Sequence, residues 1–513
     1  MALKRRRAEG EPGPSTLSER AGRALGFNLL NTLASRLGTF AIGVALARIV
    51  GPEEFGTFAV ALLALLAVLS FNELGVSLAI VRWPGPPREI APTVATISIA
   101  SSVVIFLVSL VVAPWFCDAM GAPQATDVVR LMSVNVLISG IVATPAAMLQ
   151  REFRAGPRMV IDQVGNWSGA LVSIATALAG MGAMSLAVGR LTGALLSGVL
   201  FVAWSPLRFG FDRALVRRLL VFGLPLAGSS IIVFGVTFVD QFIVGAMLGP
   251  VALGFYVLAF NLSNWPVAVF SQPVRQVAPA TFARLQGDPP AQRQAFVLSA
   301  GLLTAVTVPV CLVLTGAAGP LVDVLYGAAW SPAAEALLWL GVLAGLRILF
   351  ELAYDYLVVL GSTAVVLAVQ LIWLLALIPG VYVGARLAGI AGAAAGQVVV
   401  AIAVVLPIYL RRLHGEGIGA RDLGARVAVP IACGIGVGAM AVASQGITSL
   451  NWAALGIAGI AVLGALALQG RSIQAALRRL RSVLSDSAGE RRPPTAAVVA
   501  GAVAATPTPA AST

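Results

Sequence analysis

Charged side chains are scarce in this sequence. Asp, Glu, Lys and Arg make up only 11% of its 513 residues, whereas soluble domains carry about 25%. A water-exposed surface cannot be built over a chain of this length from so few charges. The shortage excludes an ordinary soluble protein and indicates a surface that faces lipid.

Histidine and cysteine are also rare. The sequence has one histidine, His414, and three cysteines, Cys117, Cys311 and Cys433, which lie too far apart for metal-binding or disulfide spacing. The glycine-rich phosphate loop of ATP-hydrolysing proteins is missing as well. We therefore expect no zinc chemistry, no histidine proton relay, no ATP-driven step and no cofactor.

Long hydrophobic runs are what the sequence does contain. Hydrophobic residues make up 58% of the chain, and they come in blocks of about 20, enough for a helix to cross a bilayer. Strands would leave backbone groups unpaired in lipid, so helices are expected. The pattern predicts an all-α polytopic membrane protein of about 14 spans. The spans are expected near residues 25–48, 55–80, 91–113, 128–149, 160–181, 184–204, 218–247, 251–277, 295–317, 334–360, 363–385, 389–410, 427–444 and 451–469.

The distribution of arginine supports this division into spans. The net charge of +12 could suggest a nucleic-acid partner, but the arginines gather in alternate short loops, as the positive-inside rule describes. The loops 114–127, 318–333 and 445–450 contain no Lys or Arg. We therefore expect a multi-pass membrane protein with both termini in the cytoplasm, and no nucleic-acid partner.

The sequence also contains an internal repeat. Residues 51–58 (GPEEFGTF) recur as residues 249–256 (GPVALGFY), and both copies follow one apolar span and open the next. The shift contains an even number of predicted spans, so the two copies share one orientation, as in transporters built from two lobes. Two pseudo-symmetric six-helix lobes plus two C-terminal helices are expected. The predicted divisions are a disordered basic arm (1–23), an N-lobe (24–206), a C-lobe (207–410), two further spans (411–469) and a tail (470–513).

The tail begins with an amphipathic segment. Residues 471–484 (RSIQAALRRLRSVL) place several arginines on a partly apolar helix. Such helices lie on membrane surfaces and are attracted to anionic lipids. Anionic membrane lipids are therefore expected partners, and the rest of the tail is expected to be disordered.

Several short motifs resemble those of a known transporter family. Residues 47–56 (ARIVGPEEFG) resemble the first-hairpin signature of polysaccharide-exporting flippases. Residues 240–245 (DQFIVG), 256–262 (YVLAFNL), 265–267 (WPV) and 273–275 (PVR) are similar to the colanic-acid-exporter-like branch of the Wzx-type flippases. These flippases belong to the multidrug/oligosaccharidyl-lipid/polysaccharide exporter superfamily.

The resemblance covers roughly residues 24–410. It implies a V-shaped cavity that opens alternately to the two sides of the membrane. It also implies a cargo, a polyprenyl-pyrophosphate-linked oligosaccharide destined for cell-surface polysaccharide. A polysaccharide polymerase and other glycan-assembly proteins would be further partners.

Polar residues inside two of the spans are candidates for binding this cargo. The first and eighth spans each carry a stripe of amides and hydroxyls with one arginine, Arg36 and Arg275. A guanidinium group matches the geometry of phosphate oxygens. The candidate substrate-binding residues are Arg36, Arg275, Asn28, Asn31, Asn261 and Asn264. Hydrogen bonding between packed helices is the alternative for the amides, and snorkelling to the interface is the alternative for Arg275.

Acidic residues inside spans are candidates for ion coupling. Asp240 has no charged neighbour on its own helix, and it could bind a cation or pair with an arginine. Arg347 and Glu351 lie one helical turn apart and are expected to neutralise each other, which would leave Asp355 unpaired. Asp240, Glu351 and Asp355 are therefore the candidates for ion coupling. Arg190, in the sixth span, has no partner that the sequence identifies.

Three functions stay open. A lipid-linked oligosaccharide flippase fits the polar stripes and the absence of catalytic motifs. A cation-coupled drug antiporter of the same superfamily would favour an acidic, aromatic cavity. A membrane glycan polymerase or glycosyltransferase would need a large outer loop with acidic or histidine residues, and the loop 318–333 offers only Asp323.

The flippase hypothesis makes Arg36 essential. We expect Arg36→Ala to stop translocation without unfolding the protein, because the pyrophosphate would lose a charge-assisted contact. Surface glycan in a deletion strain carrying the variant is the measurement. Normal glycan at normal protein level would refute the assignment.

Overall fold

The computed structural model describes residues 38–72, 77–83, 85–152, 154–206, 209–448 and 450–489. Over these residues the secondary structure is helical, and no strand is present. The chain is a polytopic all-α membrane protein, as the sequence predicts. Asn28, Asn31 and Arg36 lie outside the described residues.

The N-terminal half forms one helical lobe, here called the N-lobe. It begins with the helix Gly38–Val50. The helices that follow are α2 (Pro52–Asn72), α3 (Ser77–Arg82), α4 (Pro87–Ala119), α5 (Thr126–Arg151), α6 (Ala155–Leu178) and α7 (Ala183–Trp204).

The second half forms the C-lobe, and two more helices pack on it through α10. Its helices are α8 (Arg213–Pro266), α9 (Gln272–Arg284), α10 (Pro289–Gly316), α11 (Ala318–Tyr326), α12 (Ala333–Val359), α13 (Thr363–Val400) and α14 (Leu406–Gly415). The additional pair is α15 (Ala420–Ile447) and α16 (Asn451–Gly489).

The number of spans agrees with the sequence prediction. Ten helices are long and apolar enough to cross a membrane, and two of these, Ser230–Ser271 and Ala364–Gly415, are 42 and 52 residues long. Each of the two contains a sharp turn, at Gly249 (φ 82°) and at Gly389 (φ 58°), and so holds two spans. With Gly38–Val50 and α6, the total is about 14.

The polypeptide also departs from α-helical geometry where the sequence places Pro266. The helix winds more loosely there, as the π-helix Val267–Ser271, before α9 continues. Proline cannot donate the backbone hydrogen bond of its position, which explains the local change. The change of helical winding therefore begins directly after Pro266.

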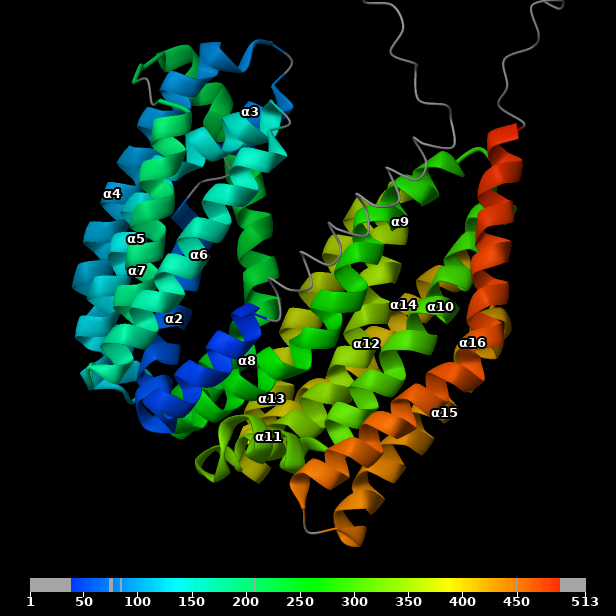
Figure 1. The fold of residues 1–513 in the computed structure, drawn as a ribbon. Coiled ribbons are helices and arrows are strands. Elements are labelled where there is room, and N and C mark those ends of the chain that lie inside the picture. The colour runs from blue at the N-terminus through cyan, green and yellow to red at the C-terminus, as the bar shows by residue number, and fades with distance from the viewer. Residues whose placement is uncertain are drawn as a thin grey trace, which may run out of the picture.

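The two lobes form a V (Figure 1). They spread apart at the end that carries α3 and α9, and they meet at the opposite end, where α2 and α8 cross. The closed end contains the Gly51-Pro52 and Gly249-Pro250 turns, whose glycines have φ values of 80° and 82°.

The two copies of the repeat lie against each other at this closed end. A Cβ atom at Gly56 would fall on the carbonyl oxygen of Pro250, and one at Gly254 would lie 3.0 Å from Cα of Gly56. The backbones can approach this closely because both positions lack side chains. The sequence shows the repeat but does not show that its two copies touch.

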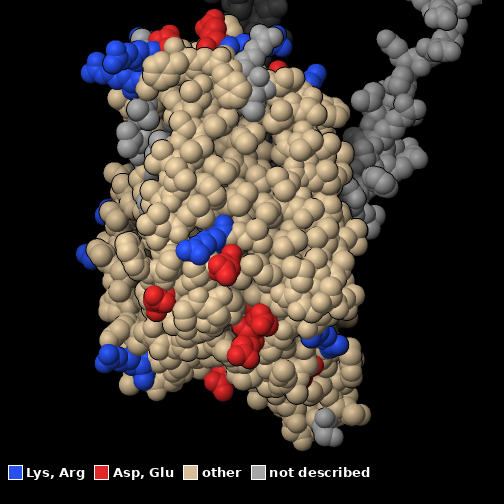
Figure 2. Space-filling view, turned by 90° about the vertical axis from the view of Figure 1, so that its left-hand side faces the viewer, with Lys and Arg blue, Asp and Glu red and all other residues tan. Residues whose placement is uncertain are grey.

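The lobe surfaces have the character expected in a bilayer. Below a rim of charged side chains, the upper part of the N-lobe face in Figure 2 is almost entirely free of Lys, Arg, Asp and Glu. On α4, Val104, Leu107 and Val111 are exposed on this lobe. Exposed apolar side chains in such a band are typical of lipid-facing helices.

The glycine contact gives a stability prediction. We expect Gly56→Val to destabilise the purified protein by about 1–3 kcal/mol, because overpacking forces the backbones apart. The matched control is Gly436→Val on α15, where a Cβ meets nothing within 4 Å. Thermal unfolding in detergent measures both variants, and equal melting temperatures would contradict the close contact.

Candidate functional site

A cavity of about 690 Å³ lies between the two lobes. Its N-lobe walls come from the helix Gly38–Val50, α2 and α6, and its C-lobe walls come from α8, the π-helix and α11. We call it the central cavity. Its lining residues are Thr39, Phe40, Gly43, Ala47, Phe55, Met159, Gln163, Asn166, Leu258, Asn261, Trp265, Ala268 and Tyr326.

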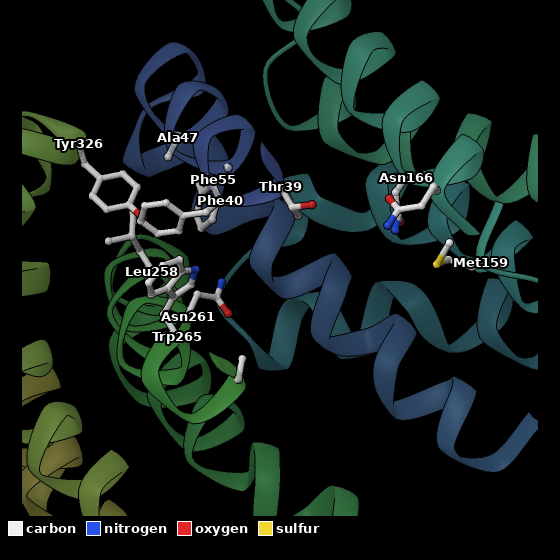
Figure 3. Close-up of a pocket in the computed structure, with 13 residues that line it drawn as sticks. Thr39, Phe40, Ala47, Phe55, Met159, Asn166, Leu258, Asn261, Trp265 and Tyr326 are labelled. Atoms are coloured by element: carbon white, nitrogen blue, oxygen red, sulfur yellow. The ribbon is translucent and has the colours of Figure 1, made fainter. Parts of the chain in front are cut away.

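Amide and aromatic side chains face each other across this cavity. In Figure 3, Asn166 stands on the N-lobe side and Asn261 with Trp265 on the C-lobe side. The rings of Phe40 and Trp265 approach across the lobes, with centroids 5.5 Å apart. Amides can exchange hydrogen bonds with hydroxyl groups, and aromatic faces give apolar contact at the same site.

The closed end forms the floor of the cavity. Trp330 is fully buried, and the rings of Phe55 from the N-lobe and Phe255 from the C-lobe meet it edge-on, at centroid distances of 5.3 and 5.8 Å. Arg48 donates hydrogen bonds from the N-lobe to the carbonyl oxygens of Val324 and Leu325, at 2.5 and 2.6 Å. Apolar packing and charge-assisted hydrogen bonds therefore both hold the lobes together here.

Among the predicted substrate residues, the structure places Asn261 in the central cavity, where it is exposed. Asn264, on the same helix, instead accepts a hydrogen bond from Arg347 at 3.3 Å. Arg347 also lies over the ring of Phe260, with its Cζ atom 5.6 Å from the centroid. Asn261 of α8 therefore lines the cavity, whereas Asn264 of the same helix is hydrogen-bonded inside the C-lobe.

Arg275 does not line the central cavity. It lines a pocket of about 270 Å³ within the C-lobe, here called the C-lobe pocket. Its guanidinium donates to both oxygens of Asp355, at 2.9 and 3.1 Å, and lies 3.7 Å from Glu351. The charge of Arg275 is therefore neutralised by neighbouring acids of α12.

The same contacts correct the expected pairing on α12. The expected ion pair between Arg347 and Glu351 is not formed, because Glu351 faces Arg275 and accepts a hydrogen bond from Ser271 at 2.7 Å. Asp355 is not the unpaired acid that helix spacing suggested. Spacing along one helix could not reveal Arg275, which comes from a different helix.

Asp240 is buried in a hydrogen-bond network of the C-lobe. Its Oδ2 atom accepts from the hydroxyl of Tyr256 at 2.9 Å and from the amide of Gln397 at 2.8 Å. Gln397 also donates to the hydroxyl of Tyr256. No side chain of the described residues donates to Oδ1, the second carboxylate oxygen, which is buried. Asp240 therefore has no arginine partner in the described structure and keeps one oxygen free of side-chain donors.

The polar wall on α6 was not among the residues predicted from the sequence. Gln163 and Asn166 line the central cavity, and Asn166 also lines a second cavity of about 630 Å³ inside the N-lobe, here called the N-lobe pocket. This pocket also contains Arg190. The spacing of Gln163 and Asn166 on one helical face was an available signal, since residues three apart lie side by side.

The fold and the cavity between the lobes define a multi-pass membrane protein of the two-lobed transporter class. The profile of the family described as "Polysaccharide biosynthesis protein" matches residues 45–335. The chain belongs to this family.

Individual relatives match over part of their length. The succinoglycan biosynthesis transport protein ExoT of Rhizobium meliloti is 29% identical over 327 residues, which are 62% of this chain and 65% of that protein. The lipopolysaccharide biosynthesis protein WzxC of Escherichia coli is 20% identical over 361 residues, which are 70% and 73% of the two chains. The chain therefore spans slightly less than two thirds of the first relative and somewhat more of the second.

Solved structures share the fold at low sequence identity. The inward closed conformation of the lipid II flippase MurJ aligns with a TM-score of 0.70 at 12% identity, over 86% of this chain and 99% of that one. An inward-facing multidrug resistance MATE transporter aligns with a TM-score of 0.59 at 17% identity, over 74% and 96%. These likenesses concern the fold.

The acid cluster around Arg275 gives a second stability prediction. Arg275→Ala leaves the buried carboxylate of Asp355 without its partner, so we expect a loss of about 1–3 kcal/mol, given that Arg275 is partly exposed. The double variant with Asp355→Ala should recover part of this loss. Thermal unfolding of both single variants and the double variant measures the coupling, and strictly additive losses would contradict the pairing.

Proposed function

We propose that this protein translocates a polyprenyl-pyrophosphate-linked oligosaccharide across the bacterial plasma membrane by alternating access. The observation that carries the proposal is the central cavity, which both lobes line with amides and aromatic rings above a closed end. The family, together with relatives named for the biosynthesis of succinoglycan and lipopolysaccharide, supports a role in cell-surface polysaccharide.

The dimensions of the cavity indicate which part of such a substrate it takes. About 690 Å³ is within the range of sites that enclose a small ligand, about 300–1,000 Å³. The cavity would hold the first sugars, while the polyprenyl tail stays in the bilayer. This transport step breaks no covalent bond and needs no catalytic residue.

The arginine-rich loops give the proposed orientation. The start of α6, next to Arg154, the start of α8 at Arg213 and the end of α9 at Arg284 lie at the wide end of the V (Figure 1). By the positive-inside rule this end would face the cytoplasm, with both termini on the same side. The structure would then be an inward-open state, ready to take its substrate from the inner leaflet.

The proposal also includes the division of the chain into lobes at residues 206 and 410, and an interaction with a glycan polymerase.

The proposal assigns separate tasks to the polar residues. Asn261 would contact the sugar directly, and Arg36, Asn28 and Asn31 keep the substrate-binding role that the sequence predicts for them. Asp240, with its free carboxylate oxygen, is the residue proposed to bind the coupling proton or cation.

The other charged residues predicted for the C-lobe would affect the change between inward-open and outward-open states indirectly. Glu351 and Asp355 hold Arg275, and Arg347 holds Asn264. An ion bound at Asp240 would therefore act on a C-lobe in which Arg275 and Arg347 already have partners.

One observation bears on the drug-antiporter alternative. The central cavity has the aromatic lining that such a transporter would use, in Phe40, Phe55, Trp265 and Tyr326. None of its described lining residues is acidic, however, and a cationic drug would need a carboxylate there. The amide lining therefore favours a sugar.

Filling the cavity tests the proposed function. Gly43 lines the central cavity and has open space where a Cβ would stand, as has Gly456 on α16, which does not line it. We expect Gly43→Trp to reduce surface glycan in a complemented deletion strain at least tenfold, with lipid-linked glycan accumulating on the inner leaflet. Gly456→Trp should complement fully. Full complementation by Gly43→Trp at equal protein level would overturn the assignment of this cavity to the transport path.

A further inference from the structure

Arg190 lies within a membrane-spanning helix of the N-lobe, on the wall of the N-lobe pocket. It is the eighth residue of α7 (Ala183–Trp204), which places its backbone about 10 Å from the closed-end terminus of that helix. It lies on the opposite helical face from Val199, whose side chain is 64% exposed on the lobe surface. Arg190 therefore faces inward, into the N-lobe pocket.

Arg190 has no counter-charge in the part of the chain that the structure describes. It makes no hydrogen bond or ion pair there, although its side chain is accessible from the pocket. Asp162 is the one acid among the described lining residues of this pocket, and its carboxylate faces Arg158 at 3.9 Å. An unpaired charge at this depth is costly, and it marks a functional site by default.

The walls of the pocket leave room for a ligand beside Arg190. Helices α6 and α7 pack through glycines: a Cβ at Gly165 would lie 2.9 Å from the carbonyl oxygen of Gly193, and one at Gly169 would lie 2.8 Å from that of Gly189. Backbone contact replaces side chains along this seam. Beside this tightly packed seam lies the pocket of about 630 Å³, and Arg190 is one of its lining residues.

Asn166 connects this pocket with the central cavity, because it lines both. It is exposed on α6, and it makes no hydrogen bond with any residue that the structure describes. Its amide is therefore a free donor near the charge of Arg190. A cationic fork and a neutral donor are the groups that phosphate oxygens require.

We infer that Arg190, together with Asn166, forms a binding site for a phosphate-ester anion, and that its ligand is the pyrophosphate of the lipid-linked substrate. The inference rests on the proposed function. It assigns the anion to the N-lobe, since Arg275 in the C-lobe is already neutralised by Asp355. A phospholipid headgroup carries the same chemistry, so the test must separate the two sources.

The test measures binding of polyprenyl pyrophosphate to the full-length protein in phosphatidylcholine nanodiscs. We expect Arg190→Met to weaken binding at least tenfold, about 1.4 kcal/mol, and Arg190→Lys to retain most of it. Uncharged polyprenol should bind all variants equally. The control is Arg130→Met, which removes an arginine of the same lobe that faces Asp127 at 3.6 Å and should leave binding unchanged.

A second arm adds phosphatidylglycerol to the nanodiscs. If Arg190→Met lowers retention of phosphatidylglycerol but not of polyprenyl pyrophosphate, the site belongs to a phospholipid and the pyrophosphate assignment is overturned. Equal loss of polyprenyl pyrophosphate and polyprenol would show a structural role for Arg190, and it too would overturn the inference.

The remaining outcomes separate this site from the proposed function. Unchanged pyrophosphate binding in Arg190→Met, with normal binding by the wild type, removes the site and leaves the flippase proposal standing. A wild type that binds no polyprenyl pyrophosphate removes both. If Arg190→Met does not fold, Asn166→Leu carries the test: at least threefold weaker binding supports the site, and unchanged binding overturns it.

Discussion

A charge inside a bilayer needs a partner or access to water. The charged residues inside the spans of this protein meet that requirement in different ways. Arg275 meets it with two carboxylates of α12, and Arg347 meets it with Asn264 and the ring of Phe260. Asp240 meets it through neutral donors on one oxygen. Arg190 meets it only through an open pocket. The paired charges link helices of the C-lobe, and the two incompletely satisfied charges, Asp240 and Arg190, are the ones proposed above to bind an ion and a ligand.

The sequence predicted the architecture well because lipid imposes simple rules on length and charge. Span positions follow from hydropathy, and the repeat is visible in the sequence itself. Partners between helices do not follow from such rules. The pairing of Arg275 with Asp355 and the placement of Asn166 between two cavities depend on how separate helices face one another. One-helix reasoning therefore paired Glu351 with the wrong arginine.

The duplicated lobes have diverged in their chemistry. Phe58 and Tyr256 occupy the same place in the two copies of the repeat. In the C-lobe the tyrosine hydroxyl donates to Asp240, while in the N-lobe the phenylalanine lines the pocket of Arg190. At equivalent positions of the repeat, the C-lobe therefore has a tyrosine that donates to an acid, and the N-lobe has a phenylalanine that lines the pocket of a base.

The aromatic cluster around Trp330 sets an energetic demand on any outward-opening step. Parting Phe55 from Trp330 would expose aromatic surface that is now buried. If about 150–250 Å² becomes wet, the cost is about 4–6 kcal/mol. One elementary charge that crosses a potential of 100 mV releases about 2.3 kcal/mol. A single charge at that voltage supplies less than this cost, so contacts that form elsewhere between the lobes in an outward-open state would have to offset the rest.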